Sequence, residues 1–234
     1  MRGALSRDGE PDRASLPCTS VPESSCLTAV RASYDTVAAA YAERVLRPSE
    51  LDPFSRGMLA AFAETVRRSA LGPVADLGCG PGYVTAHLAG LGLPVFGVDL
   101  SAGMVEPARR AHPDLRFVQS SMTALGVGDG VLGGILAWYS THHTPPAELP
   151  LLFAGFQRTL APGGHLLWGC HIGDEQRRLT RAYGHPVSYA WHLLPVERVA
   201  GLLERAGLRV VARLVQEPDE QSPRPCACLL ACKA

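Results

Sequence analysis

A glycine-rich turn between two acidic residues has the clearest chemical meaning in this sequence. The turn reads Asp76-Leu77-Gly78-Cys79-Gly80-Pro81-Gly82 and follows a short apolar run that begins at Val74. Because glycine lacks a Cβ, the backbone of such a turn can adopt left-handed dihedrals and lie against a ligand. A second acid, Asp99, ends another apolar run 21 residues after Gly78. One carboxylate can accept hydrogen bonds from two adjacent ribose hydroxyls, so the two motifs together predict a nucleoside site.

The glycine spacing argues against a dinucleotide ligand. A dinucleotide fingerprint would place its third glycine at position 83, which is Tyr83 here. The carboxylate of Asp76 would also repel a diphosphate and attract a cation. An NAD-dependent reductase is therefore a less favoured alternative, and the sequence lacks a Tyr-x-x-x-Lys catalytic pair.

Residues 76–82 and 95–101 closely resemble the first two motifs of the class I S-adenosylmethionine-dependent methyltransferases. In that family the glycine turn passes under the methionine and ribose of the cofactor, the strand-end acid lies near its amino group, and the second acid binds the ribose. The resemblance covers roughly residues 30–232 and implies that S-adenosylmethionine is the cofactor. It implies cofactor contacts for Asp76, Gly78, Cys79, Gly80, Gly82, Asp99 and Leu100.

The position at which the family commonly has an acid for the adenine amino group is occupied by Ser121. A hydroxyl can still accept a hydrogen bond from that amine, although a neutral acceptor forms a weaker bond than a carboxylate. Met122 and Met104 would provide apolar faces for the adenine ring. Ordinary core packing is the alternative role of both methionines.

Aromatic and polar side chains are concentrated at residues 136–143, where the fourth expected strand ends. Ligands of open parallel sheets bind beyond the carboxyl ends of the strands, so an acceptor should meet the methyl group of the cofactor here. Trp138 and Tyr139 are predicted to line the site because electron-rich rings suit a sulfonium cation, and Tyr139 is also a catalytic candidate. His143 is the candidate general base, with packing as its alternative role. No metal site is predicted, because no Asp or Glu lies at a suitable interval from the histidines.

The composition is that of an ordinary globular enzyme. The chain has 234 residues, of which 47% are hydrophobic and 19% charged. Lys plus Arg and Asp plus Glu both number 22, so no net charge attracts a nucleic acid. We find no membrane-spanning run and no secretion signal. The seven cysteines include no Cys-x-x-Cys pair, which indicates reduced thiols and a cytoplasmic location.

Strand-like runs alternate with helical ones from Val74 onward, which is typical of a parallel sheet covered by helices. An amphipathic helix is expected before them, over residues 28–47. After a first strand at Val74, the expected strands cover residues 95–98, 115–118, 131–137, 165–169, 209–216 and 226–232. The last two are joined by a polar loop without a helix. The expected fold is an α/β Rossmann-like class I methyltransferase sandwich with a seven-stranded, mostly parallel sheet whose last strand is antiparallel.

The domain organisation follows from the same patterns. Residues 1–27 are rich in Pro, Ser and charged side chains, which predicts a disordered tail. Residues 28–234 are expected to form a single methyltransferase domain. Its predicted additions are an N-terminal helical cap at residues 28–70 and an aromatic-rich cap insertion at residues 170–194. Tyr41 in the first cap is assigned to the cofactor, because it could help to exclude water from the sulfonium.

The resemblance implies an enzyme that transfers a methyl group from S-adenosylmethionine to a small-molecule acceptor by in-line displacement. Because the sulfonium makes the methyl carbon electrophilic, the protein has chiefly to align a nucleophile and exclude water. The expected partner is a small molecule, with neither nucleic acid nor membrane, and the acceptor atom and oligomeric state stay open. The alternative from another class is a protein that binds the cofactor without catalysis.

Overall fold

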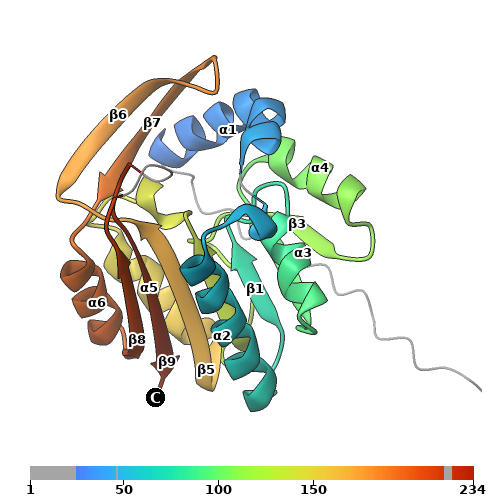
Figure 1. The fold of residues 1–234 in the computed structure, drawn as a ribbon, viewed down its shortest axis with the longest axis vertical. Coiled ribbons are helices and arrows are strands. Elements are labelled where there is room, and N and C mark those ends of the chain that lie inside the picture. The colour runs from blue at the N-terminus through green and yellow to red at the C-terminus, as the bar shows by residue number, and fades with distance from the viewer. Residues whose placement is uncertain (1–24, 46, 219–222) are drawn as a thin grey trace, which may run out of the picture.

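The computed structural model describes residues 25–45, 47–218 and 223–234. A seven-stranded sheet forms the centre of the described fold (Figure 1). Its order is β3-β2-β1-β4-β5-β9-β8, from β1 (Val74–Leu77), β2 (Val95–Asp99), β3 (Arg116–Gln119), β4 (Leu132–Trp138), β5 (Leu160–His171), β8 (Leu208–Gln216) and β9 (Cys226–Lys233). Strands β1 to β5 are parallel, and β9 is antiparallel to both of its neighbours. The predicted Rossmann-like fold with an antiparallel last strand is confirmed.

Helices cover both faces of this sheet. They are α2 (Pro53–Ser69), α3 (Tyr83–Gly90), α4 (Ala102–Ala111), α5 (Leu149–Thr159) and α6 (Val196–Arg205). Phe62 of α2 shares a core cluster with Leu136 of β4, whereas Phe153 of α5 shares another with Ile135 of the same strand. Because successive side chains of a strand point to opposite faces, the two clusters lie on opposite sides of the sheet. The central strands are thus buried on both faces, which leaves the loops at their carboxyl ends to meet a ligand.

Helix α1 (Ser25–Arg44) lies between α4 and strand β7 (His185–Leu193) at one end of the fold (Figure 1). Asp35 Oδ1 accepts hydrogen bonds from Ser101 Oγ at 2.5 Å and from the backbone N–H of Gly103 at 2.9 Å. Ser33 Oγ accepts one from the backbone N–H of Ser188 at 2.9 Å. These polar contacts fix α1 over the loop that follows β2.

The bounds of α1 differ from the expected helix at residues 28–47. Within the described residues the helix covers Ser25–Arg44, and it ends before the short 3-10 helix η1 (Pro48–Glu50). Of the predicted tail at residues 1–27, residues 1–24 lie outside the described ranges, and the last three are helical. The division into tail, cap and insertion otherwise stays a prediction.

The predicted insertion at residues 170–194 contains a β-hairpin that the sequence reading did not anticipate. Strand β6 (Glu175–Ala182) pairs antiparallel with β7, and their two-residue connection, Tyr183 and Gly184, has positive φ values of 52° and 84°. Such a turn matches the twist of paired strands. Val187 and Tyr189 alternate along β7 and are buried against α1, so the aromatic side chains serve this packing. No helix among the described residues is long and apolar enough to cross a membrane.

Candidate functional site

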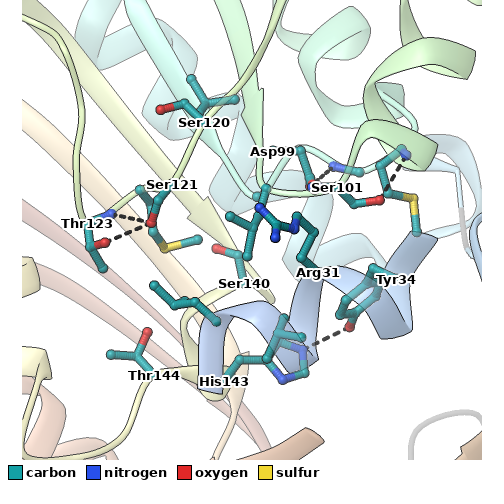
Figure 2. Close-up of a pocket in the computed structure, with 18 of the residues that line it drawn as sticks. Arg31, Tyr34, Asp99, Ser101, Ser120, Ser121, Thr123, Ser140, His143 and Thr144 are labelled. Atoms are coloured by element: carbon teal, nitrogen blue, oxygen red, sulfur yellow. Dashed lines mark hydrogen bonds between the residues drawn. The ribbon is translucent and has the colours of Figure 1, made fainter. Parts of the chain in front are cut away.

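A pocket lies beneath α1 at the carboxyl ends of strands β1 to β4, and it encloses about 790 Å³, part of which is open to solvent (Figure 2). The structure brings many of the predicted site residues to its wall: Tyr41, Gly78, Gly80, Leu100, Asp99, Met104, Ser121, Met122, Trp138, Tyr139 and His143. Three predicted residues, Asp76, Cys79 and Gly82, lie beside the pocket and do not line it.

All three glycines of the turn need their lack of a side chain. Gly78, Gly80 and Gly82 have φ values of +76°, +53° and +82°, which residues with a Cβ rarely adopt. A Cβ on Gly78 would lie 2.3 Å from Ser140 Cβ, and a Cβ on Gly82 would lie 2.7 Å from the ring of Phe117. Among the described residues, the atom that a Cβ on Gly80 would meet within 4 Å belongs to the Tyr41 ring, at 3.7 Å. The middle glycine therefore leaves open space on the pocket side of the turn.

The carboxylate of Asp99 is oriented by two backbone donors. Its Oδ2 accepts a hydrogen bond from Gly80 N at 2.8 Å, and its Oδ1 accepts one from Ser101 N at 2.9 Å. Burial raises its pKa above the ordinary aspartate value. Since each carboxylate oxygen can accept more than one hydrogen bond, both oxygens retain capacity for the adjacent hydroxyls of a ribose.

Asp76 and Cys79 face away from the pocket. Asp76 is 1% exposed, it accepts a hydrogen bond from Thr85 Oγ1 at 2.6 Å, and burial raises its pKa to about 7. Cys79 packs against Val105 and Phe117, and burial raises its thiol pKa. Thr85 of α3 thus holds the carboxylate of Asp76 under the turn, and the expected position of this residue near the amino group of the cofactor stays a prediction.

The region expected to hold adenine includes Ser121, labelled in Figure 2, and the methionines Met122 and Met104, which also line the pocket. Ser121 Oγ accepts a hydrogen bond from Thr123 N at 3.2 Å and lies 2.7 Å from Thr123 Oγ1. If the serine donates its proton to Thr123, one lone pair stays available for an amine. Hydrogen bonds with Thr123 in the same loop therefore orient the Ser121 hydroxyl.

The backbone after β4 is strained at Tyr139, where φ is +50° in a residue other than glycine. Its N–H donates to the carbonyl of Gly169 at 2.7 Å, and the missing Cβ of Gly169 makes room for the ring of Trp138. Burial and a hydrogen bond with Cys226 raise the pKa of Tyr139. Its phenol therefore stays protonated, and the catalytic role assigned to it stays a prediction.

His143 forms hydrogen bonds through both ring nitrogens. Nδ1 lies 3.1 Å from the carbonyl oxygen of Ala190, and Nε2 lies 2.9 Å from the hydroxyl of Tyr34. Because a carbonyl can only accept, Nδ1 carries the proton, and Nε2 accepts the Tyr34 proton. Burial lowers the pKa of His143 to about 4, so the ring is neutral at neutral pH. This geometry leaves Nε2 no lone pair for an acceptor. The role of His143 as general base stays a prediction.

Comparisons with known proteins agree with this geometry. A family model described as a methyltransferase domain matches residues 74–164. The chain is 29% identical over 149 residues to an uncharacterized methyltransferase of Synechocystis, which covers 60% of this chain and 68% of the relative. It is 37% identical over 112 residues to the trans-aconitate 2-methyltransferase of Rhizobium meliloti, which covers 41% of this chain and 37% of the relative.

Solved structures show the same fold along most of the chain. One is a 1,6-didemethyltoxoflavin-N1-methyltransferase of Burkholderia thailandensis with bound S-adenosylhomocysteine, with a TM-score of 0.64, 20% identity, and 92% and 93% of the two chains covered. Another is a magnesium protoporphyrin IX methyltransferase of Synechocystis with bound S-adenosylmethionine, with a TM-score of 0.67, 15% identity, and 92% and 100% covered. Residues 74–164 thus match a methyltransferase domain, and the chain as a whole has the fold of S-adenosylmethionine-dependent methyltransferases.

The pocket fits S-adenosylmethionine, the molecule bound in the magnesium protoporphyrin IX methyltransferase. The open space at Gly80 suits the close approach of a ligand to the backbone. Asp99 suits its ribose, and Ser121 suits the adenine amine. The aligned segments span 68% of the Synechocystis relative but 37% of the Rhizobium relative. The acceptors in the relatives' names therefore describe those proteins alone.

Sequence reasoning did not assign Arg31, Ser140 or Thr144 to the site, although all three line the pocket. Arg31 lies three residues before Tyr34, so helical spacing from the cap tyrosine could have found it. Ser140 Oγ is buried, and it has no hydrogen-bond partner in the described part of the chain. Ser140 belongs to the polar segment at residues 136–143, but its place in the pocket depends on how the loop after β4 packs against Gly78.

Proposed function

We propose that this methyltransferase transfers the methyl group of S-adenosylmethionine to a small-molecule acceptor that binds beneath α1. One observation carries the proposal: the pocket extends beyond the residues assigned to the cofactor. Leu27, Val30, Arg31 and Thr144 line this further part. A protein that only bound the cofactor would not need this further lining.

The side chains of this pocket act mainly by positioning. When bound, the cofactor supplies an electrophilic methyl group on a sulfonium. Asp99 and the glycine turn would fix the nucleoside, while Tyr34 and His143 join α1 to the loop after β4 over the acceptor space. Holding two reactants in line and dry can contribute about 7–11 kcal/mol, whereas a general base contributes about 10²- to 10⁴-fold in rate. We therefore assign His143 to positioning.

A turnover assay tests this function. The protein is incubated with methyl-labelled S-adenosylmethionine and panels of small acceptors, and both S-adenosylhomocysteine and labelled product are measured. Formation of both in equal amounts is the expected result. Saturable binding of S-adenosylhomocysteine without product from any panel would instead favour the alternative of a non-catalytic binding protein.

The proposed setting of this reaction is the cytoplasm. No disulfide joins the six described cysteines, as is typical of a reducing compartment. The net charge of zero supports a small molecule over a nucleic acid as the partner.

A further inference from the structure

We propose that the acceptor is a small carboxylate, that Arg31 binds it, and that one of its carboxylate oxygens takes the methyl group. The proposal rests on the proposed methyl-transfer function and concerns the part of the pocket left by the cofactor residues. Two features carry it: a cationic side chain in that part, and the lack of a described wall residue able to take a proton from an acceptor.

Arg31 projects from α1 into the pocket and is partly buried there (Figure 2). It precedes Tyr41 by ten residues, or roughly 15 Å of helix at 1.5 Å per residue. Tyr41 packs near Gly80 of the glycine turn, where the family places the methionine end of the cofactor. The backbone of Arg31 therefore lies far along α1 from the place where the cofactor's own carboxylate belongs, and its side chain extends from there into the pocket (Figure 2).

The charged and titratable groups on the described wall are Arg31, Tyr34, Tyr41, Asp99, Tyr139 and His143. Burial raises the pKa of each of the three tyrosines, so each phenol keeps its proton at neutral pH.

The remaining two candidates for a base are already engaged. Both oxygens of Asp99 accept backbone hydrogen bonds, and their remaining capacity is assigned to the ribose hydroxyls at that end of the pocket. Both nitrogens of His143 are hydrogen-bonded, to Tyr34 and to the carbonyl of Ala190. An acceptor must therefore arrive with its nucleophilic lone pair already free.

The ordinary pKa values of the possible acceptors then select among them. Phenols ionise near pH 10 and amines are protonated at neutral pH, so both would need a base, and a protonated amine would also be repelled by Arg31. A carboxylate is ionised above about pH 4. Its two oxygens match the donors of a guanidinium, which binds carboxylates bidentately. Leu27 and Val30 on the same face of α1 would contact an apolar body of the acceptor.

The transfer balances without a proton. One carboxylate oxygen forms a bond to the methyl carbon while the bond between carbon and sulfur breaks, and the electron pair of that bond stays on sulfur. The sulfonium becomes a neutral thioether, and the carboxylate becomes a neutral methyl ester. Loss of charge on both molecules weakens the hold of Arg31 on the product and favours its release.

Labelling with matched acceptor mixtures tests the chemical class. Aliphatic and aromatic carboxylates of four to about twelve carbons form one mixture, and alcohols, phenols and amines with the same skeletons form the others. The expected result is label from the methyl group in the carboxylate mixture alone, released as methanol by mild alkali, as methyl esters require. Alkali-stable label in another mixture overturns the carboxylate proposal and leaves the methyl-transfer function standing. No label in any mixture counts against both.

Variants test the assignment to Arg31 by binding as well as by activity. Arg31→Gln should weaken binding of the best-labelled carboxylate, measured calorimetrically in excess S-adenosylhomocysteine, by about 10- to 100-fold, the effect of losing one or more charge-assisted hydrogen bonds. Affinity for S-adenosylhomocysteine alone should stay within twofold of wild type, and Arg31→Lys should recover part of the loss. Arg44→Gln, on the exposed last turn of the same helix, is the matched control. A loss confined to S-adenosylhomocysteine binding would assign Arg31 to the cofactor and overturn the proposal.

Discussion

Replacing Asp99 by asparagine should weaken cofactor binding by about 100-fold. The carboxylate accepts from Gly80 N and Ser101 N through different oxygens, at 2.8 and 2.9 Å. Asparagine has one oxygen, so one of these N–H groups would face an amide nitrogen that cannot accept. A hydrogen bond to a charged group contributes about 1.5–3 kcal/mol, and two adjacent ribose hydroxyls would lose such a bond each. A total of roughly 3 kcal/mol corresponds to about 100-fold in Kd.

Isothermal titration of S-adenosylhomocysteine into the wild type and the Asp99→Asn variant measures this effect directly. Thermal unfolding of both proteins shows whether the variant still folds, and Asp114→Asn, an exposed acid in the same half of the sheet, is the matched control. A folded Asp99→Asn protein that binds within about threefold of the wild type would refute the assignment of Asp99 to the ribose.

Three further changes probe the turn and two buried titratable groups. Gly82→Ala should destabilise the fold by about 2–4 kcal/mol in denaturant unfolding, because residue 82 has a positive φ and a Cβ there would meet the ring of Phe117. Gly57→Ala is the control: a Cβ on this residue of helix α2 would meet open space, so the change should be neutral or slightly stabilising. Burial lowers the pKa of His143 to about 4, while the unfolded chain takes up the proton below about pH 6.5, so stability should fall as pH drops through this window. His143→Gln should lose less melting temperature than wild type between about pH 7 and pH 5, and equal losses would contradict the reasoning. Burial raises the pKa of Asp76 to about 7, so the folded state holds a proton that the unfolded chain releases above about pH 4, and stability should fall as pH rises between these values. Asp76→Asn should therefore gain melting temperature over the wild type at about pH 8 and not at about pH 4, and a difference independent of pH would argue against a raised pKa.

The sheet could be predicted from sequence because its signals are local. Apolar runs, the glycine turn and the acid at the end of β2 each lie within a few residues, and parallel strands require the alternating helices that the pattern showed. The antiparallel β9 was predictable because the loop before it has no helical pattern. The hairpin β6–β7 was not predicted, although Val187 and Tyr189 alternate, because the aromatic side chains of residues 170–194 were assigned to a cap over the substrate.

The side-chain roles at the site were less predictable, because they depend on contacts between distant segments. His143 looked available as a base, yet its nitrogens are bonded to Tyr34, 109 residues away, and to Ala190, 47 residues away. The resemblance places Asp76 near the cofactor, but only the structure shows that its carboxylate accepts a hydrogen bond from Thr85 on the next helix. Only the folded arrangement shows which lone pairs are already in use.

Asp35 gives helix α1 a part in shaping the nucleoside end of the pocket. Its carboxylate accepts hydrogen bonds from Ser101 and Gly103, 66 and 68 residues away, in the segment that follows the acid assigned to the ribose. A truncated chain beginning at residue 47 would keep both sequence motifs and the whole segment 74–164 recognised by the family comparison. It would nevertheless lose Tyr41 and the two hydrogen bonds by which Asp35 holds the loop between β2 and α4. The smallest unit able to retain cofactor is therefore larger than the stretch by which the family is recognised.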